Sequence, residues 1–596
     1  MTDKTNIQTR IAQLREQMSK HQVQALIVPS ADPHMSEYLP EYYQGRAYFS
    51  GFTGSVGTLV VAENFAHIWV DSRYWLQAEG QLAGTGIELK KLEPAKPAHA
   101  DYLVEHLPQG SVVAVDDMVL SVAEYERLTA LFAPKGITLK TVDLIDDVWE
   151  NRPAIPSAPV YVHAEAFVDT SASQKLAKVR AAMQDKKVSY HLISSLDDIA
   201  WLTNLRGQDV NCNPVFLAHL LIDQTNAVLF VNPNKLDAAA KAQLDKAGIQ
   251  VRAYEEVYPA MAEVTESLLI DGAKVAIGTI KKLPKEVALI KAMNPSTLLK
   301  AVKSDADLAH IRVAMAQDGA ALCEFFAEFE AKIARNETVT EVDIDGMLIE
   351  ARSRQPYYRG PSFDSIVGFR GNGALAHYRA TPDSHSTIAG DGLLLIDSGC
   401  QFDNGTTDIT RMVGVGHISD EAKKDVTYVL KSHIALAQAV FPVGTPSPML
   451  DMIARQPMWQ AGLNYGHGTG HGVGYFMNVH EGPQVIAYNA PITPERTMLK
   501  GMVSSNEPGL YREGKWGIRI ENLVATVSAP DSEFGEFLCF EDLTLCPIDT
   551  RIILPELLTK EEKAWLNEYH QKVHDALIER VEGDAKAWLI ARTQPV

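Results

Sequence analysis

The first 300 residues repeat one pattern of short apolar segments, and this repeat constrains the fold more than any other feature of the sequence. From Ala25 the chain reads ALIVPS, YFSGFTG, VGTLVV and AHIWVDS, and from Tyr190 it reads YHLISS, WLTNLRG, FLAHLLI and AVLFVN. Each segment has the length of a strand, and the Gly, Asn and Asp residues between segments are typical of turns. Helical stretches follow at 102–106 and 235–247. The pattern predicts two copies of one α/β module.

Proline and a change of periodicity mark the ends of these modules. The segment NRPAIPSAP at 151–159 separates the two copies, and near residue 300 the strand pattern gives way to a long helix. This helix is predicted from Asp305 to about Ile333, because apolar residues recur on one face. We therefore predict an α/β (α+β) protein with three domains, at 1–155, 156–302 and 303–596.

The C-terminal tail at 557–591 carries a second apolar helical stripe. The apolar residues that recur at helical spacing in this tail are Trp565, Leu566, Tyr569, Val573, Ala576 and Leu577. A stripe of this kind predicts a helix that docks onto the preceding domain.

Charge and cysteine content narrow the class of function. The net charge of −20 repels nucleic-acid phosphate and anionic lipid, and no segment approaches the ~18 to 20 apolar residues of a membrane span. The first 20 residues lack the apolar run of a signal peptide, and the five scattered cysteines lack metal-binding spacing. We expect a cytoplasmic protein with reduced thiols that binds neither nucleic acid nor membrane.

The segment at 393–413 gives the strongest chemical signal. LLLIDSG and TTDITRMV read as two strands of a hairpin, with DNG at 403–405 between them. A two-residue turn at Asn404 and Gly405 would put Asp408 opposite Gln401, about 13 Å along the strand from Asp397. A wider loop would set Asp397 opposite Asp408, with Cβ atoms ~5 Å apart. We expect the wider loop, in which the two facing carboxylates need a cation or a shared proton.

Two histidines lie in the glycine-rich segment GHGTGHGVG at 466–474. His467 and His471 are four residues apart, but five glycines in nine residues disfavour a helix. We expect a loop or an extended strand, in which glycine lets the backbone approach a neighbour closely. His480 follows in NVHEGP.

Two further carboxylates follow in strand-like segments. Glu507 precedes Pro508 in SNEPG, which favours an extended backbone at Glu507. In GIRIENLVATV, Arg519 and Glu521 share one face of the strand by the two-residue period. These two residues either form an ion pair or belong to a site.

The charges of these residues predict the kind of site. Asp397, Asp408, Glu507 and Glu521 carry four negative charges, and His471 would be a neutral ligand. Two divalent ions balance that charge and leave room for a bridging hydroxide. An oxygen-rich shell suits Mn²⁺, although the sequence also allows Zn²⁺, Co²⁺ or Fe²⁺.

In this order, the motifs resemble those of the pita-bread metallopeptidases, and most of all the long, three-domain cytosolic form of Xaa-Pro aminopeptidase (aminopeptidase P). The resemblance extends over nearly the whole chain and rests on SEYLPEYYQGRAYFSGFTGSVG, GNGALAHYRA, DSGCQFDNGTTDITR, GHGTGHGVGYFMNVHEGP and WLNEYHQKVHDALIERV. It implies a pita-bread catalytic domain at 303–596, in which the metal ligands are Asp397, Asp408, His471, Glu507 and Glu521.

The resemblance also implies an activity. The enzyme would hydrolyse the N-terminal Xaa-Pro bond of peptides, with a metal-bridging hydroxide as nucleophile and Glu507 as proton relay. His377 and His480 would hydrogen-bond the substrate and its developing oxyanion. The residues expected around the substrate are His377, His467, His480 and Arg519. A homodimer is implied as well, formed through the catalytic domain and the tail.

Two alternatives remain open from the sequence. A prolidase-type dipeptidase would cleave only dipeptides, because a basic group holds the free carboxylate, and the duplicated N-terminal module argues against it. A metal-free binding protein with the pita-bread fold would need no ligands, whereas all five ligand types are present.

Overall fold

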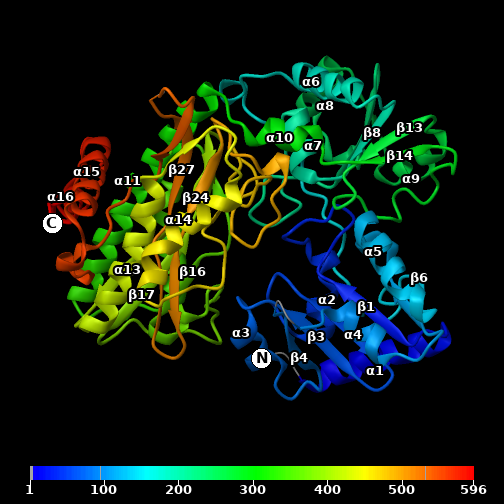
Figure 1. Ribbon diagram of the computed structural model, residues 1–596, viewed down its shortest axis with the longest axis horizontal. Helices are drawn as coiled ribbons and strands as arrows, with labels where there is room; N and C mark the ends of the chain where they lie inside the picture. Colours follow the sequence, from blue (N-terminus) through cyan, green and yellow to red (C-terminus); the bar gives the residue numbers. More distant parts are fainter. Residues whose placement is uncertain (1–3, 94–95, 531) are drawn as a thin grey trace. The chain divides into compact units, whose positions relative to one another are not determined.

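The computed structural model describes residues 4–93, 96–530 and 532–596, and the chain divides into two compact units. The first unit comprises Met1–His163 and Thr170–Thr297. The second comprises Ala164–Asp169 and Leu298–Val596. Figure 1 shows the elements of both units along the chain.

The first unit contains two six-stranded sheets with the same strand order, β4-β3-β2-β1-β5-β6 and β12-β11-β10-β8-β13-β14. In each sheet one central strand, β1 or β8, pairs antiparallel with one neighbour and parallel with the other. The predicted duplication of an α/β module is therefore confirmed. The strands of the first sheet are β1 (Ala25–Pro29), β2 (Thr58–Ala62), β3 (Ala66–Val70), β4 (Glu88–Lys91), β5 (Val112–Val115) and β6 (Thr138–Thr141). Those of the second are β8 (Tyr190–Ile193), β10 (Ala218–Asp223), β11 (Ala227–Val231), β12 (Ile249–Arg252), β13 (Ser267–Ile270) and β14 (Ala288–Lys291).

Helices connect and cover these strands. The first is α1 (Lys4–Lys20), which buries Ile7, Ile11 and Leu14. The others that frame the sheets are α3 (Trp75–Leu82), α4 (His99–His106), α5 (Val122–Phe132), α6 (Ala172–Asp185), α8 (Ala238–Ala247) and α9 (Val257–Ala260).

The second segment of each repeat is a helix and not the strand that we predicted. YFSGFTG contributes to α2 (Gly45–Ser50), and WLTNLRG contributes to α7 (Leu196–Thr203), followed by the two-residue β9 (Leu205–Arg206). Each helix ends at a left-handed residue, Gly51 with φ 72° or Asn204 with φ 54°. These residues terminate helices, although the sequence pattern suggested turns between strands.

The second unit is built from antiparallel strands flanked by long helices (Figure 1). One sheet has the order β16-β17-β20 and another has the order β21-β28-β27-β24. Their strands are β16 (Ile366–Phe369), β17 (Gly392–Ser398), β20 (Ile409–Val415), β21 (Val440–Pro442), β24 (Val503–Asn506), β27 (Asn522–Ser528) and β28 (Phe537–Asp542). The main helices are α11 (Asp305–Ala334), α12 (Glu341–Ser353), α13 (Asp420–Ala437) and α14 (Ser447–Gln460). The predicted long helix and the mixed α/β class are confirmed.

The tail forms α15 (Lys560–Leu577) and α16 (Gly583–Arg592), which lie beside α11 in Figure 1. Leu566, Tyr569, Val573 and Leu577 are buried in a core shared with α11 and α13. The predicted docking helix is confirmed. Because its apolar stripe is covered within its own unit, only other faces of the tail remain for an interface between chains.

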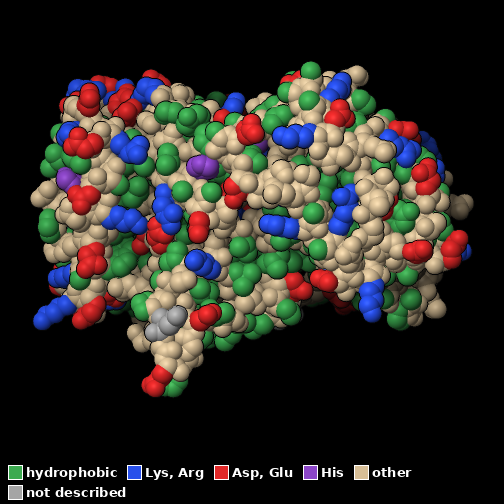
Figure 2. Space-filling model, turned by 90° about the horizontal axis from the view of Figure 1, so that it is seen from above, with side chains coloured by type: hydrophobic (Ala, Val, Ile, Leu, Met, Phe, Trp, Pro, Cys, Tyr) green, Lys and Arg blue, Asp and Glu red, His purple; other side chains and the backbone are tan. Residues whose placement is uncertain are grey.

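Three further features bear on the expected environment. Within the described residues, no helix has the length and apolarity needed to cross a bilayer. All five cysteines are free thiols. On the face shown in Figure 2, Lys and Arg side chains alternate with Asp and Glu and do not gather into one basic patch.

Candidate metal centre

The hairpin that carries the two aspartates has a register between the two that we considered. Asp397 on β17 lies opposite Thr410 on β20. Farther along, β18 (Cys400–Phe402) pairs with β19 (Gly405–Thr406), and Phe402 lies opposite Gly405. The expected wider loop, with Asp397 opposite Asp408, is therefore wrong. Because Asp408 lies two residues from Thr410, it still projects from the same face as Asp397.

Packing of the hairpin against α11 explains this register. The two-residue turn is Asp403–Asn404, so Gly405 lies in a strand and not in the turn. A Cβ atom at Gly405 would lie 2.8 Å from Cβ of Ala314 on α11. Asn404 donates a hydrogen bond of 2.9 Å to the side-chain oxygen of Gln317, also on α11. Close approach to a helix therefore requires the glycine that we attributed to the turn.

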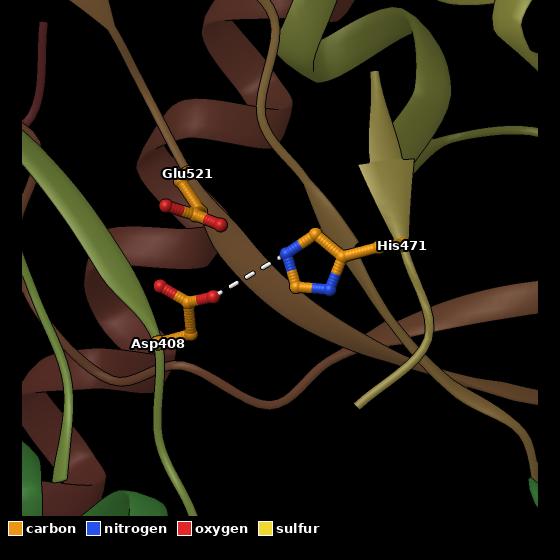
Figure 3. A group of neighbouring side chains, drawn as sticks. All are labelled: Asp408, His471 and Glu521. Carbon is orange, nitrogen blue, oxygen red and sulfur yellow. Dashed lines mark ion pairs between the residues drawn. The ribbon is translucent and has the colours of Figure 1, made fainter. Parts of the chain in front are cut away.

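Three predicted ligands converge in the second unit (Figure 3). One ligand atom from each of Asp408, His471 and Glu521 lies within 4.8 Å of the others. Asp408 precedes β20, His471 ends β22 (Gly470–His471), and Glu521 precedes β27. The Nε2 atom of His471 lies 3.5 Å from Oδ2 of Asp408. Three separate strand ends thus supply the side chains that point toward one another in Figure 3.

The other two predicted ligands lie next to this group. Oε1 of Glu507, which precedes β25 (Gly509–Arg512), is 3.5 Å from Nε2 of His471. Asp397 forms an ion pair with Arg519, the last residue of β26 (Trp516–Arg519). The second carboxylate oxygen of Asp397, Oδ1, is buried without a hydrogen-bond partner among the described residues. Of the two alternatives for Arg519 and Glu521, the ion pair between them is not formed, because Arg519 pairs with Asp397.

The electrostatics of the cluster favour a bound cation. Burial, together with Asp408, raises the pKa of Glu521 well above its usual value. Burial also raises the pKa of Asp397 to about 7, against the opposing effect of Arg519. Burial alone would lower the pKa of His471, but Asp408 and Glu507 outweigh it and raise the pKa to about 9. Carboxylates that repel one another in this way are stabilised by positive charge.

The residues present fit a divalent metal site. Four carboxylates and one imidazole form a hard donor set, and the orphaned Oδ1 of Asp397 is a buried acceptor with a free lone pair. Thr410 orients one of these carboxylates, because its hydroxyl donates a hydrogen bond of 2.7 Å to Oε2 of Glu521. Such outer partners orient metal ligands.

The residues expected around the substrate form a connected group beside the cluster. Arg519 donates a hydrogen bond of 2.7 Å to the hydroxyl of Tyr511, which lies 2.9 Å from Nε2 of His467. The ring of His480 packs edge-on against His471 at 4.2 Å between centroids. His377 is half-buried, and the carbonyl of the preceding Ala376 accepts a hydrogen bond of 3.5 Å from Arg519.

Sequence reasoning missed Tyr511 and Thr410. Tyr511 bridges Arg519 and His467, and Thr410 contacts both Glu521 and Arg519. The two-residue period of a strand would have found both residues, because Tyr511 lies four positions after Glu507 and Thr410 lies two after Asp408.

Family models match almost the whole chain. The Metallopeptidase family M24 model matches residues 309–527, and the C-terminal region of peptidase_M24 matches residues 536–596. The Creatinase/Prolidase N-terminal domain is matched twice, at 10–150 and 151–307.

Individual relatives match over the full length. A probable Xaa-Pro aminopeptidase P of Laccaria bicolor is 39% identical and covers 99% of this chain and 94% of its own. Aminopeptidase P2 of Arabidopsis thaliana is 38% identical, with coverage of 96% and 86%.

Solved structures agree with these relatives. X-prolyl aminopeptidase from Caenorhabditis elegans, described as a cytosolic enzyme with a di-nuclear active site, is 30% identical with a TM-score of 0.95 over 100% of both chains. A Xaa-Pro dipeptidase from Bacillus anthracis has a TM-score of 0.51 and 23% identity over 64% of this chain and all of its own, a likeness of fold alone.

Proposed function

The chain belongs to the aminopeptidase P group of metallopeptidase family M24, and we propose that it hydrolyses the N-terminal Xaa-Pro bond of peptides in a metal-dependent reaction. One observation in the structure carries the proposal. Ligand atoms of Asp408, His471 and Glu521 lie within 4.8 Å of one another. They belong to a cluster of five residues in which bound cations would stabilise the buried carboxylates.

We propose that two divalent metal ions occupy this site, held by Asp397, Asp408, His471, Glu507 and Glu521. Mn²⁺ is the proposed metal because the donor set is rich in carboxylate oxygen. When bound, such ions lower the pKa of a water molecule and polarise a carbonyl group.

The remaining residues have distinct proposed roles in the hydrolysis. Glu507 takes the proton of the attacking water and delivers it to the proline nitrogen as the C–N bond breaks. The Ser505 hydroxyl donates a hydrogen bond of 3.2 Å to Oε1 of Glu507, which orients this carboxylate. His377 and His480 donate hydrogen bonds to the carbonyl oxygen as its negative charge develops.

We propose that Arg519, Tyr511 and His467 bound the pocket for the proline ring. Two hydrogen bonds join these three side chains, so each fixes the position of the next. The Xaa-Pro amide lacks an N–H group, so its recognition depends on the ring and the carbonyl oxygen.

The assay that tests this function uses peptides of two, three and nine residues with proline in second position. Matched peptides with alanine in that position are the control. We expect release of the first residue from all three proline peptides, loss of activity with a chelator, and recovery with Mn²⁺. Cleavage of the dipeptide alone would indicate a prolidase-type dipeptidase, and a chain that retains no metal and cleaves none of them would indicate a binding protein.

Two further properties remain proposals. We propose a cytoplasmic enzyme, supported by the C. elegans structure, which is described as cytosolic. We also propose a homodimer formed through the second unit, because α14 exposes Met449, Met452 and Trp459. Light scattering should give twice the chain mass, and Met449→Glu with Met452→Glu should reduce it to one chain. A wild-type mass of one chain would contradict the dimer.

A further inference from the structure

A buried group of three charged side chains lies behind the loop that carries His480. Glu481, the next residue, is buried, and each of its carboxylate oxygens lies within ion-pair distance of a lysine ammonium group. Nζ of Lys300, on α10 (Pro295–Ala301), is 3.0 Å from Oε2. Nζ of Lys303, which precedes α11, is 2.8 Å from Oε1. The Lys300–Glu481–Lys303 triad is therefore a buried, desolvated ionic group.

The backbone of Glu481 is fixed to the strand that carries His471. Its N–H group donates a hydrogen bond of 2.8 Å to the carbonyl of Gly472, which follows His471. A Cβ atom at Gly472 would lie 2.0 Å from the carbonyl oxygen of Glu481. One at Gly474 would lie 2.9 Å from Oε2 of the same residue. Two glycines of the segment GHGTGHGVG thus make room for Glu481.

The backbone at Lys303 is also fixed to a neighbouring segment. The N–H group of Lys303 donates a hydrogen bond of 3.0 Å to the carbonyl of Gly501, and Val302 forms a bridge with Met502. Both lysine side chains are at most 2% exposed. The loop with His480 is therefore anchored on one side to the His471 strand and on the other to the start of α11.

Stability alone does not account for such a group. A buried ionic cluster is often no more stabilising than well-packed apolar residues of the same volume, whereas it does fix geometry through directional bonds. Here the fixed element places His480 with its ring 4.2 Å from that of His471.

We propose that the Lys300–Glu481–Lys303 triad positions His480 for the reaction. This inference rests on the proposed function of His480 as a hydrogen-bond donor to substrate. Glu481 is then a positioning residue, which acts on catalysis only through its neighbour.

The test replaces the whole triad, because removing one member leaves a buried charge unpaired and destabilises the fold. The triple variant Lys300→Met, Lys303→Met, Glu481→Met replaces each charged side chain by an unbranched apolar one of similar length and removes all charge. We expect kcat to fall about tenfold to a hundredfold, as for a misplaced catalytic group, with KM changed by less than about threefold. A kcat equal to that of the wild type would overturn the proposal.

The matched control removes a buried ion pair far from the site in sequence. Asp209 and Lys235 form such a pair in the first unit, with side chains at most 2% exposed. Asp209→Met with Lys235→Met should leave kcat and KM unchanged. An equal loss of kcat in this control would show a general effect of burial and would overturn the proposal.

A double-mutant cycle separates positioning from general damage. His480→Ala alone should lower kcat by about 10²-fold to 10³-fold. When the triple replacement is added to His480→Ala, kcat should fall no further, because the group being positioned is already absent. If the triple replacement lowered kcat by the same factor with and without His480→Ala, the proposal would be contradicted.

A spectroscopic measurement tests the same point without substrate. In protein labelled with ¹³C at histidine Cε1, the His480 resonance is identified by its absence in His480→Ala. The triple replacement should shift or broaden it and leave the His570 resonance in place. An unmoved His480 resonance would overturn the positioning role. A wild-type chain that cleaves no Xaa-Pro peptide would instead contradict the proposed function, and the spectra would still decide the positioning.

Discussion

At the scale of single residues, the site brings together side chains from separate strand ends, and their roles differ although several are histidines. His471 lies with Asp408 and Glu521 in the cluster, whereas the ring of His480 packs edge-on against that of His471. Residue type and spacing identified both histidines. Their separate roles follow from the direction of each side chain, which only the fold determines.

Replacing these two histidines should therefore give opposite results. His471→Ala should empty or weaken at least one metal position, because a ligand is lost. His480→Ala should retain metal and lose turnover by about 10²-fold to 10³-fold. Metal analysis beside kinetics checks both variants. A depleted His480→Ala and a fully loaded His471→Ala would reverse the assignment.

The Tyr511 hydroxyl should contribute to substrate binding through Arg519 and His467. Tyr511→Phe removes both hydrogen bonds, and we expect kcat/KM to fall about fivefold to tenfold, equivalent to ~1 to 1.4 kcal/mol. Steady-state kinetics on a tripeptide measures the loss. Tyr102→Phe in the first unit is the control and should have wild-type kinetics. An unchanged Tyr511→Phe would remove Tyr511 from the pocket.

At the scale of secondary-structure elements, the predictions were correct where the sequence has a clear hydrophobic period or a clear glycine-rich pattern. The helix from Asp305, the docking stripe of the tail and the glycine-rich loop are all present. The helices α2 and α7 were missed because a run of six to eight residues is too short to reveal its period, and only the left-handed Gly51 and Asn204 mark their ends. The hairpin register depended on contact with α11, which no local pattern contains.

The tail helix α15 supports the strands of the site through the buried hydroxyl of Tyr569. The Tyr569 hydroxyl lies 2.9 Å from Nη2 of Arg411, and Nη1 of Arg411 donates a hydrogen bond of 2.7 Å to the carbonyl of Glu521. Tyr569→Phe should lower the free energy of unfolding by about 1 to 3 kcal/mol, because buried polar groups lose a partner. Urea denaturation measures this change.

Glu568→Gln on the exposed face of the same helix is the control and should leave stability within about 0.5 kcal/mol of the wild type. Equal stability of both variants would show that the tail contact contributes nothing.

At the scale of the whole molecule, two related modules precede the unit with the site, and the repeat was visible in the sequence because both copies use the same strand order. The boundaries at 155 and 302 remain predictions.

The first unit buries several neutral histidines, which link its stability to pH. Burial lowers the pKa of His34 and His219 and lowers that of His191 to about 4.

Acid should therefore destabilise the first unit. Below pH 6.5 the unfolded chain binds protons that the folded His191 does not, so stability is lost as pH falls from 6.5 to about 4. Each such histidine contributes up to ~1.4 kcal/mol per pH unit. Denaturation midpoints at pH 7 and pH 5 should differ less in His191→Asn than in the wild type. An equal difference would contradict this linkage.

Above all, we propose that the cluster of Asp397, Asp408, His471, Glu507 and Glu521 holds two divalent metals. Crystals of the chain grown with Mn²⁺ test it directly through anomalous diffraction at a wavelength where manganese scatters anomalously. We expect two peaks among these five side chains, and their loss or weakening in Asp408→Asn crystals of unchanged fold. Peaks elsewhere, or none at the cluster, would contradict it.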